Sequence, residues 1–463
     1  MSRTLLLAVA LLLVACGNSS RDTTPGGGGG VDPGASGGEG GAADGEGAGG
    51  VNVPPNGGEG GGEATVGGGE GEGEGEEEAG EEGKADEGGE GGEGGDGAEG
   101  DDGDEEGEGG EGDDGGEEGE PYVVPEFGVK GTRILEVMAN AVQGLRRPRD
   151  LEFNPERPTE LWVADERLEA MIILFDAPSD ERRAEVRADA AGRHFMASVS
   201  GIAFGAPDTF ASCQESRNEI DPRAPDFMGP SLWSSDLDIF AVVGQRGENG
   251  MNGSHLDMLH QSPLCKGIAH EEGNAYWVAD GAGGPRGSGG LPHIVRYDFG
   301  RDHGPGRSDH SDGRVRRYVE AQFHPVEGVS SHMERDPNSD WLYFVETGRG
   351  MVMRLDTSTG EVTKTLRLNH EELAEYAEVT GVTVEEWVSE GLDQPSGIAI
   401  GEERIFVSDY GSKEIVAYDH DGVELGRIDT KGDRVMGLEL GPEGRLWFVD
   451  TGFAEVVRVL PEG

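Results

Sequence analysis

The sequence predicts an all-β fold, a six-bladed β-propeller on residues 121–463, and three observations lead to it. A phrase of three or four short strands recurs six times after residue 145. One such sheet cannot bury its own face, so the copies must stack against one another. The sixth copy ends after three strands, and an unassigned strand near Ile134 can supply the missing outer strand. Pairing the two would remove the open edges of the ring.

Each copy follows the same order of patterns. It opens on a short inner strand that is Gly-rich or apolar. A second, aromatic-rich strand follows and usually ends on an acidic residue. In the third strand, apolar and polar residues alternate. The clearest copy spans residues 266–270, 275–280 and 293–298. In chain order the second strands are residues 161–165, 209–213, 275–280, 341–346, 404–409 and 445–450.

Two regions depart from this pattern. The second copy carries a long insertion, residues 214–264, in which residues 237–243 are expected to form its next strand. The fourth copy is expected to end on a strand at residues 362–366. After it, good helix formers with Asn369 and Thr383 as possible caps predict two short inserted helices, residues 371–379 and 384–391.

The first 15 residues predict a cleaved targeting signal. Arg3 precedes an apolar run that is too short to span a bilayer, and small residues follow it. The sequence Leu13-Val14-Ala15-Cys16 resembles the bacterial lipobox, in which the cysteine is diacylated and becomes the mature N-terminus. The resemblance implies a lipid on Cys16 and anchoring in the bacterial cell envelope. No Asp follows Cys16, which favours the outer membrane.

Residues 16–120 predict a disordered tether between the lipid and the propeller. They are almost wholly Gly, Glu, Asp and Ala, a composition that cannot offset the entropy of ordering the backbone. From residue 17 on, this segment holds 33 acidic and two basic residues, which gives a net charge of −31. The whole chain carries −56, so the remaining residues, without Arg3, carry −26. A coil of this length spans roughly 55 Å. The negative field argues against nucleic acid as a partner.

The fifth copy, residues 395–419, contains Pro-Ser-Gly-Ile-Ala-Ile, Ile-Phe-Val-Ser-Asp-Tyr-Gly-Ser and Glu-Ile-Val-Ala-Tyr-Asp. This phrase resembles the NHL repeat, and the resemblance extends over most of residues 147–460. It implies a propeller similar to NHL-repeat and gluconolactonase-like proteins. Those groups include protein-binding, RNA-binding and a few hydrolytic or lyase members, so the resemblance implies a fold and leaves the function open.

Cys213 and Cys265 are expected to lie near one face of neighbouring blades, because one ends a second strand and the other precedes an inner strand. We expect a disulfide between them that pins the long insertion, with two free buried thiols as the alternative. The acids that close the second strands allow two readings: a ring of metal ligands, or acceptors for backbone N–H groups in the following turns. Their occurrence once per blade favours the second reading.

Histidines and acids cluster in the third copy and predict a possible zinc or calcium site. The alternative is a hydrogen-bonded surface loop. His332 starts an inner strand, where a side chain can point into the channel. A similar propeller, the lyase domain that completes peptide amidation, holds zinc at inner-strand starts, and only His332 matches that pattern. The candidate ligands are His270, His332, His303, Asp309, His310 and Asp312.

These features favour a cell-surface lipoprotein whose propeller is a binding module for a protein or glycan. The tether suits reach, and no assembled catalytic set is evident in the sequence. The alternative is a metal-dependent extracytoplasmic hydrolase or lyase that uses the channel, with His332 and His270 joined by loop residues of the third blade.

Overall fold

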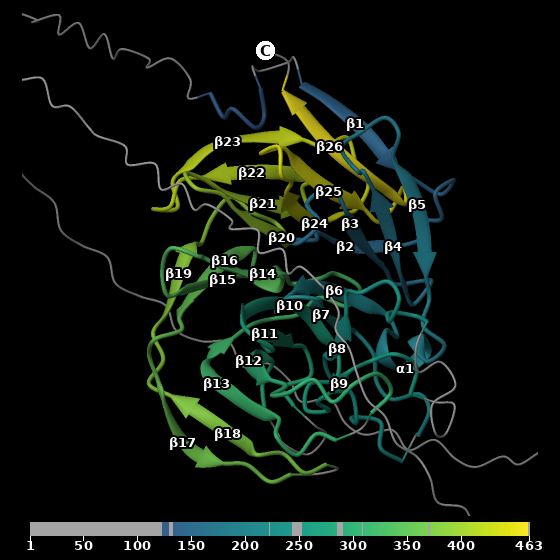
Figure 1. The fold of residues 1–463 in the computed structure, drawn as a ribbon. Helices are drawn as coiled ribbons and strands as arrows, with labels where there is room; N and C mark the ends of the chain where they lie inside the picture. The colour runs from purple at the N-terminus through teal and green to yellow at the C-terminus, as the bar shows by residue number, and fades with distance from the viewer. Residues whose placement is uncertain are drawn as a thin grey trace, which may run out of the picture. The chain divides into compact units, whose positions relative to one another are not determined.

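Six β-sheets surround a common centre, and their innermost strands meet side by side (Figure 1). This computed structural model describes residues 123–128, 133–221, 223–242, 252–284, 290–307, 309–368 and 371–461. The predicted signal segment, Cys16 and the predicted tether lie outside the described residues. We number the sheets as blades 1 to 6 in chain order of their inner strands. Each inner strand contacts the next, and the sixth contacts the first, so the six-bladed propeller is confirmed.

Blades 1, 2, 5 and 6 have four strands each. Blade 1 consists of β2 (Pro148–Phe153), β3 (Leu161–Asp165), β4 (Ala170–Phe175) and β5 (Arg183–Arg187). Blade 2 consists of β6 (Val199–Phe204), β7 (Thr209–Gln214), β8 (Ser231–Ser234) and β9 (Asp257–Met258). Blade 5 consists of β20 (Pro395–Ile400), β21 (Ile405–Asp409), β22 (Glu414–Tyr418) and β23 (Glu424–Asp429).

Blade 6 closes the ring with strands from both ends of the propeller. Its strands are β24 (Val435–Leu440), β25 (Leu446–Asp450), β26 (Glu455–Pro461) and β1 (Arg133–Ala139). Strand β1 pairs antiparallel with β26, with Arg133 opposite Pro461 and Val137 opposite Val457. The predicted closure by the strand near Ile134 is therefore confirmed.

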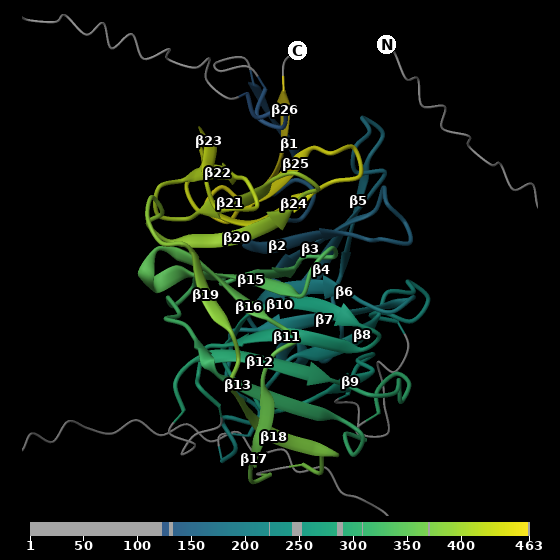
Figure 2. The same cartoon turned by 90° about the vertical axis from the view of Figure 1, so that its left-hand side faces the viewer.

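Two strands that lie between the last two strands of blade 4 in the chain join blade 3, and this corrects the prediction. Blade 3 consists of β10 (Cys265–Glu272), β11 (Ala275–Asp280), β12 (His293–Asp298) and β13 (Arg314–Gln322), extended outward by β18 (Glu375–Thr380) and β17 (Glu361–Thr365) (Figure 2). Blade 4 consists of β14 (Met333–Arg335), β15 (Trp341–Glu346), β16 (Met351–Asp356) and β19 (Val384–Val388). The strand expected to end blade 4, residues 362–366, instead overlaps β17 at the edge of blade 3.

The two predicted helices, residues 371–379 and 384–391, are wrong, because these segments contain β18 and β19. Strand β18 lies parallel to β13 and buries Tyr376 and Val379. Strand β19 buries Trp387, whose ring packs edge-on against Tyr343 at 5.0 Å. The exposed edges of β13 and β16 offer unpaired backbone groups, and pairing with them outweighs the local helix propensity of Glu and Ala.

The insertion in blade 2 also differs from the prediction. The third strand is β8, whereas residues 237–242, which fall in the expected strand 237–243, form turns. Helix in the described residues is limited to one turn, α1 (Gly192–Phe195), and a 3-10 turn, η1 (Thr347–Arg349). None of the helices described has the length and apolar character needed to cross a membrane.

The hydrophobic core is divided among the six gaps between neighbouring blades. Each of its six clusters draws on two adjacent sheets. Between blades 1 and 2, Trp162 and Phe210 lie edge to face with centroids 4.9 Å apart, and Phe210 also stacks near Trp233. Aromatic pairs of this kind add about 1 kcal/mol beyond the burial of their area. The stacking of blades predicted from the repeats is therefore the main source of the core.

Candidate functional site

The inner strands bring chemically distinctive side chains to the central channel. Three of the six inner strands carry Gly at one position and Ala two residues later, such as Gly201 and Ala203. In blades 1 and 4 the Gly is replaced by Asp150 and His332, which line the channel cavity. The Ala position holds an acid in three blades: Glu152, Glu334 and Glu439.

Asp150 and His332 meet across the channel and narrow it. His332 Nδ1 lies 3.4 Å from Asp150 Oδ1, and His332 Nε2 donates a hydrogen bond of 3.0 Å to the Ser200 carbonyl. The backbone N–H of Ile202 donates to Asp150 Oδ2 at 2.9 Å. Burial raises the pKa of Asp150, and His332 acts in the opposite direction. Asp150 can lie against the inner strand of blade 6 because that strand has glycine there: a Cβ on Gly437 would lie 2.6 Å from Asp150 Oδ1.

The three glutamates share a cavity of about 450 Å³ beside this constriction. Glu152 Oε2 accepts a hydrogen bond from the N–H of Phe204, and Glu334 Oε2 accepts one from Ile400, both at 2.8 Å. Burial raises the pKa of Glu334 to about 8. Burial and the neighbouring carboxylates raise the pKa of both Glu152 and Glu439 well above the usual range.

Within the described residues, none of these three glutamates forms an ion pair with Lys or Arg. Arg335 also lines the cavity, but its recorded ion pair is with Asp340 at 3.7 Å. The cavity is therefore an acidic recess in which, among the described residues, no Lys or Arg is paired with the three glutamates. Such a recess favours a positively charged ligand group, because unpaired carboxylates in a poorly solvated site are costly.

Basic residues near the starts of the inner strands are already paired. Arg149 is 1% exposed and contacts Glu166 at 3.0 Å and Glu215 at 2.8 Å. Lys266 also pairs with Glu215 and donates to the Val326 carbonyl at 2.7 Å. Burial alone would raise the pKa of Glu215, but Arg149 and Lys266 outweigh it and lower the pKa. None of these paired residues lines the glutamate recess, so the network does not neutralise it.

The acids that close the second strands accept backbone hydrogen bonds, as the structural interpretation predicts. Asp165 accepts from the N–H groups of Arg146 and Arg147 at 2.6 and 2.8 Å. Asp450 accepts from Asp433 at 2.7 Å and Gly452 at 2.9 Å. The same kind of bond recurs at the remaining three, which are Asp280, Glu346 and Asp409.

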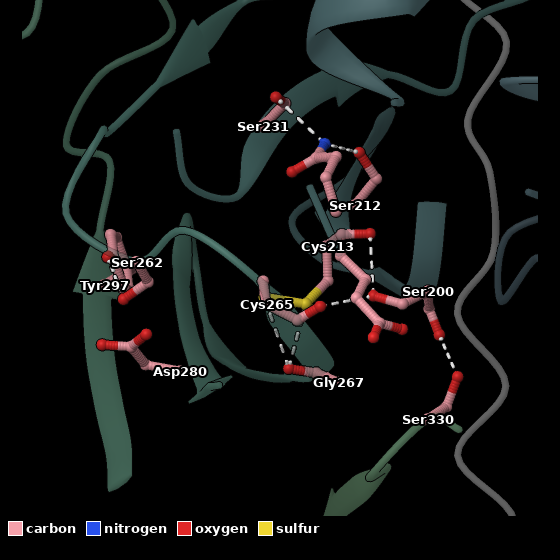
Figure 3. The surroundings of a disulfide bond; sticks show 12 residues. Ser200, Ser212, Cys213, Ser231, Ser262, Cys265, Gly267, Asp280, Tyr297 and Ser330 are labelled. Carbon is pink, nitrogen blue, oxygen red and sulfur yellow. Dashed lines mark hydrogen bonds between the residues drawn. A yellow bond between two sulfur atoms is a disulfide. The ribbon is translucent and has the colours of Figure 1, made fainter. Parts of the chain in front are cut away.

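The predicted disulfide is present and joins blades 2 and 3 (Figure 3). It links Cys213 of β7 to Cys265 of β10 with a Cα–Cα distance of 5.4 Å. Both cysteines are buried, and Ser200 Oγ donates to the carbonyls of Cys213 and Cys265 at 3.2 and 2.7 Å. The bond ties together the two ends of the long insertion, residues 214–264.

The six predicted metal ligands lie in three places. His270 and His332 both line the channel cavity, and His270 Nε2 bonds the Gly273 carbonyl at 3.0 Å. Three others stay within the loop of blade 3: His303, Asp309 and Asp312. His303 Nε2 lies 2.8 Å from Asp312 Oδ1, and His303 Nδ1 lies 3.7 Å from Asp309 Oδ2.

None of these loop residues lines the channel cavity, so the structure does not bring them to His332. Burial opposes ionisation of Asp312, but hydrogen bonds from His303 and Arg301 lower its pKa to about 2. The remaining candidate, His310, turns away from the loop and its Nδ1 lies 2.6 Å from Asp257 Oδ1. Metal binding at these residues stays a prediction.

Sequence reasoning missed the three channel glutamates. Their signal lies in the repeat itself, because each takes the place of an Ala that the other inner strands carry. Aligning the inner strands of all six copies would single them out. A residue type that breaks a structural repeat at a channel-facing position is a functional candidate.

Comparison with known proteins shows similarity to solved propellers only. No protein-family model and no curated protein matches the chain. An auxiliary nutrient binding protein from Bacteroides ovatus is 11% identical, with 72% of this chain and 77% of that chain covered and a TM-score of 0.43. A gluconolactonase from Xanthomonas campestris is 14% identical, with 71% and 89% covered and a TM-score of 0.44.

A calcium-binding protein, regucalcin, from Agrobacterium tumefaciens is 14% identical, with 70% of this chain and 92% of that chain covered and a TM-score of 0.43. Similarity at this level carries no information about the ligand or reaction of this chain.

Proposed function

We propose that this chain is a lipid-anchored cell-surface binding module whose propeller takes a positively charged group of a protein or glycan into its channel. The anchor is the predicted lipid on Cys16, and the predicted tether, residues 16–120, would carry the propeller away from the outer membrane. A lysine side chain or an amino sugar carries the positive charge that the recess favours.

The observation that supports this function is the gathering of Glu152, Glu334 and Glu439 in one cavity without a paired cation among the described residues. Burial raises the pKa of all three, and that of Glu334 to about 8, so Glu334 holds a proton at neutral pH. A bound ammonium group would favour the ionised carboxylates and release protons. Binding should therefore tighten as the pH rises towards 8.

The alternative is a metal-dependent extracytoplasmic hydrolase or lyase that uses the same channel. The binding function is favoured because His332 is engaged on both ring nitrogens, by Ser200 and Asp150. The loop residues that were expected to join His332 lie elsewhere. A calcium titration nevertheless separates the two functions, because three carboxylates also suit a hard divalent cation.

The test is calorimetry on the full chain with ligands of single or low charge. The ligands are Nα-acetyl-lysine methylamide and the glucosamine dimer, each compared with its N-acetylated, uncharged form, and calcium chloride. The channel variant combines Glu152→Gln, Glu334→Gln and Glu439→Gln. The control variant combines the exposed substitutions Glu181→Gln, Glu361→Gln and Glu402→Gln, which remove the same charge. Both variants keep the acidic segment, so its weak attraction for cations cancels.

We expect the lysine derivative to bind the wild type and the control variant, and to bind about tenfold more tightly at pH 8.5 than at pH 6, because its ammonium group stays charged over this range. The channel variant should lose this binding, and the acetylated ligands should not bind. Equal amine binding by the channel and control variants would overturn the proposal. Stoichiometric calcium with no amine binding would favour the metal-dependent alternative instead.

A further inference from the structure

A second group of chemically matched side chains lies outside the channel, where three segments of the chain converge. His260 comes from the insertion in blade 2, His310 from the loop of blade 3, and Glu371 from the connection between β17 and β18. One ligand atom from each lies within 4.8 Å of the others. The three side chains are only 5%, 12% and 4% exposed.

Hydrogen bonds fix one carboxylate oxygen of Glu371, and the other oxygen faces both imidazoles. Its Oε1 accepts hydrogen bonds from the N–H of His260 at 2.8 Å and from Gln261 Nε2 at 3.0 Å. Its Oε2 lies 2.7 Å from His260 Nδ1 and 3.9 Å from His310 Nε2. Three potential ligand atoms therefore converge: one oxygen and two imidazole nitrogens.

Neighbouring residues orient both rings. His310 Nδ1 lies 2.6 Å from Oδ1 of Asp257, a carboxylate that is 1% exposed, so this nitrogen carries the proton and Nε2 is left free to bind. A carboxylate behind a histidine in this way is typical of metal-binding histidines. The ring of Phe227 stacks on His260 at 3.5 Å with an interplanar angle of 4°.

We propose that His260, His310 and Glu371 form a binding site for a divalent metal ion of the zinc class. Two imidazoles and one carboxylate are a ligand set that zinc takes, whereas calcium prefers oxygen ligands throughout. Metal–ligand distances of about 2.0–2.2 Å place tetrahedral ligands about 3.3 Å apart. The separations of 2.7 and 3.9 Å from Glu371 Oε2 bracket that value, so small side-chain shifts complete the site.

The site keeps one coordination position for a further ligand. A cavity of about 350 Å³ adjoins it, lined by His260 and His310 together with apolar residues such as Phe195 and Ile220. Three protein ligands beside an open cavity are the arrangement in which zinc binds water or a small exogenous ligand. The site is separate from the glutamate recess, because none of its three ligands lines the channel cavity.

The test measures zinc and cobalt binding by the full chain, made without an affinity tag of histidines and stripped with a chelator. The variants are His310→Ala and the isosteric Glu371→Gln, and Asp257→Asn probes the supporting carboxylate. His303→Ala is the matched control, because His303 lies in the same loop and bonds Asp312. Circular dichroism and thermal unfolding report whether each variant keeps the fold. Cobalt absorption in the visible range distinguishes a tetrahedral site from weak binding by the many acidic residues.

We expect one zinc per chain and an intense tetrahedral cobalt spectrum in the wild type and in His303→Ala. Glu371→Gln and His310→Ala should weaken zinc at least tenfold, and Asp257→Asn should weaken it about 10- to 100-fold. The channel variant described above should bind zinc like the wild type. Absence of stoichiometric zinc, an octahedral cobalt spectrum only, or unchanged affinity in a folded Glu371→Gln variant would overturn the proposal.

Discussion

Replacing Glu334 by glutamine should stabilise the propeller at alkaline pH and leave its stability nearly unchanged at acid pH. Burial, which outweighs the hydrogen bond from Ile400, raises the pKa of Glu334 from 4.5 to about 8, and nearby Asp336 adds to the effect. Between these two values the folded chain holds a proton that the unfolded chain has lost. The contribution of Glu334 to the free energy of unfolding therefore falls as the pH rises through this window and is constant above it.

The magnitude follows from the width of the window. One pH unit corresponds to about 1.4 kcal/mol, so a difference of about 3.5 units sets a ceiling of about 5 kcal/mol. Glu152 and Glu439 remain in the same cavity, so part of the unfavourable energy of the buried carboxylates persists in the variant. We therefore expect Glu334→Gln to gain about 2 kcal/mol at pH 9 and less than about 0.5 kcal/mol at pH 4.5. The glutamine can still accept the hydrogen bond from Ile400.

Urea unfolding followed by tryptophan fluorescence at pH 4.5, 7 and 9 measures this effect. Glu386→Gln, at an exposed position of the same blade, is the control and should change stability by only a few tenths of a kcal/mol at each pH. A gain for Glu334→Gln that is the same at every pH would refute the reasoning. So would a loss of stability at pH 9, because the carboxylate would then be stabilising when ionised.

Two further predictions concern the disulfide and the buried charges. The double variant Cys213→Ser, Cys265→Ser should lose about 4 kcal/mol of unfolding free energy, because the bond closes a sequence separation of 52 residues; two free thiols in a non-reducing peptide map of the wild type would contradict this. Arg149→Met should lower the free energy of unfolding by about 3 kcal/mol, since Glu166 and Glu215 lose a buried partner. A change below about 1 kcal/mol in urea unfolding would show that Lys266 alone compensates the charge of these carboxylates.

The blades could be predicted because each strand carries its pattern locally and the pattern recurs. The strand near Ile134 was found as the partner that the sixth copy lacked. Strands β18 and β19 could not be found in this way, because Glu and Ala favour helix and only the edges of β13 and β16 favour strand. Local propensity is overridden where a neighbouring sheet supplies the hydrogen bonds.

The functional groups show the same division. The channel glutamates are visible in the sequence once the inner strands are aligned, since Glu334 takes the place of an Ala. His260 and Glu371 carry no such signal, because they come from segments far apart in the chain and meet only through the packing of blades 2 and 3. Among the predicted metal ligands, His310 alone lies in that cluster.

The pairing of β1 with β26 sets the order in which this domain can be completed. Arg133, in the first described strand, lies opposite Pro461, at the end of the last one. A nascent chain, or one threading through a pore, therefore holds five blades before the seven residues of β26 exist to join the ring. In such vectorial folding the pairing of β1 with β26 is the last contact of the ring to become available.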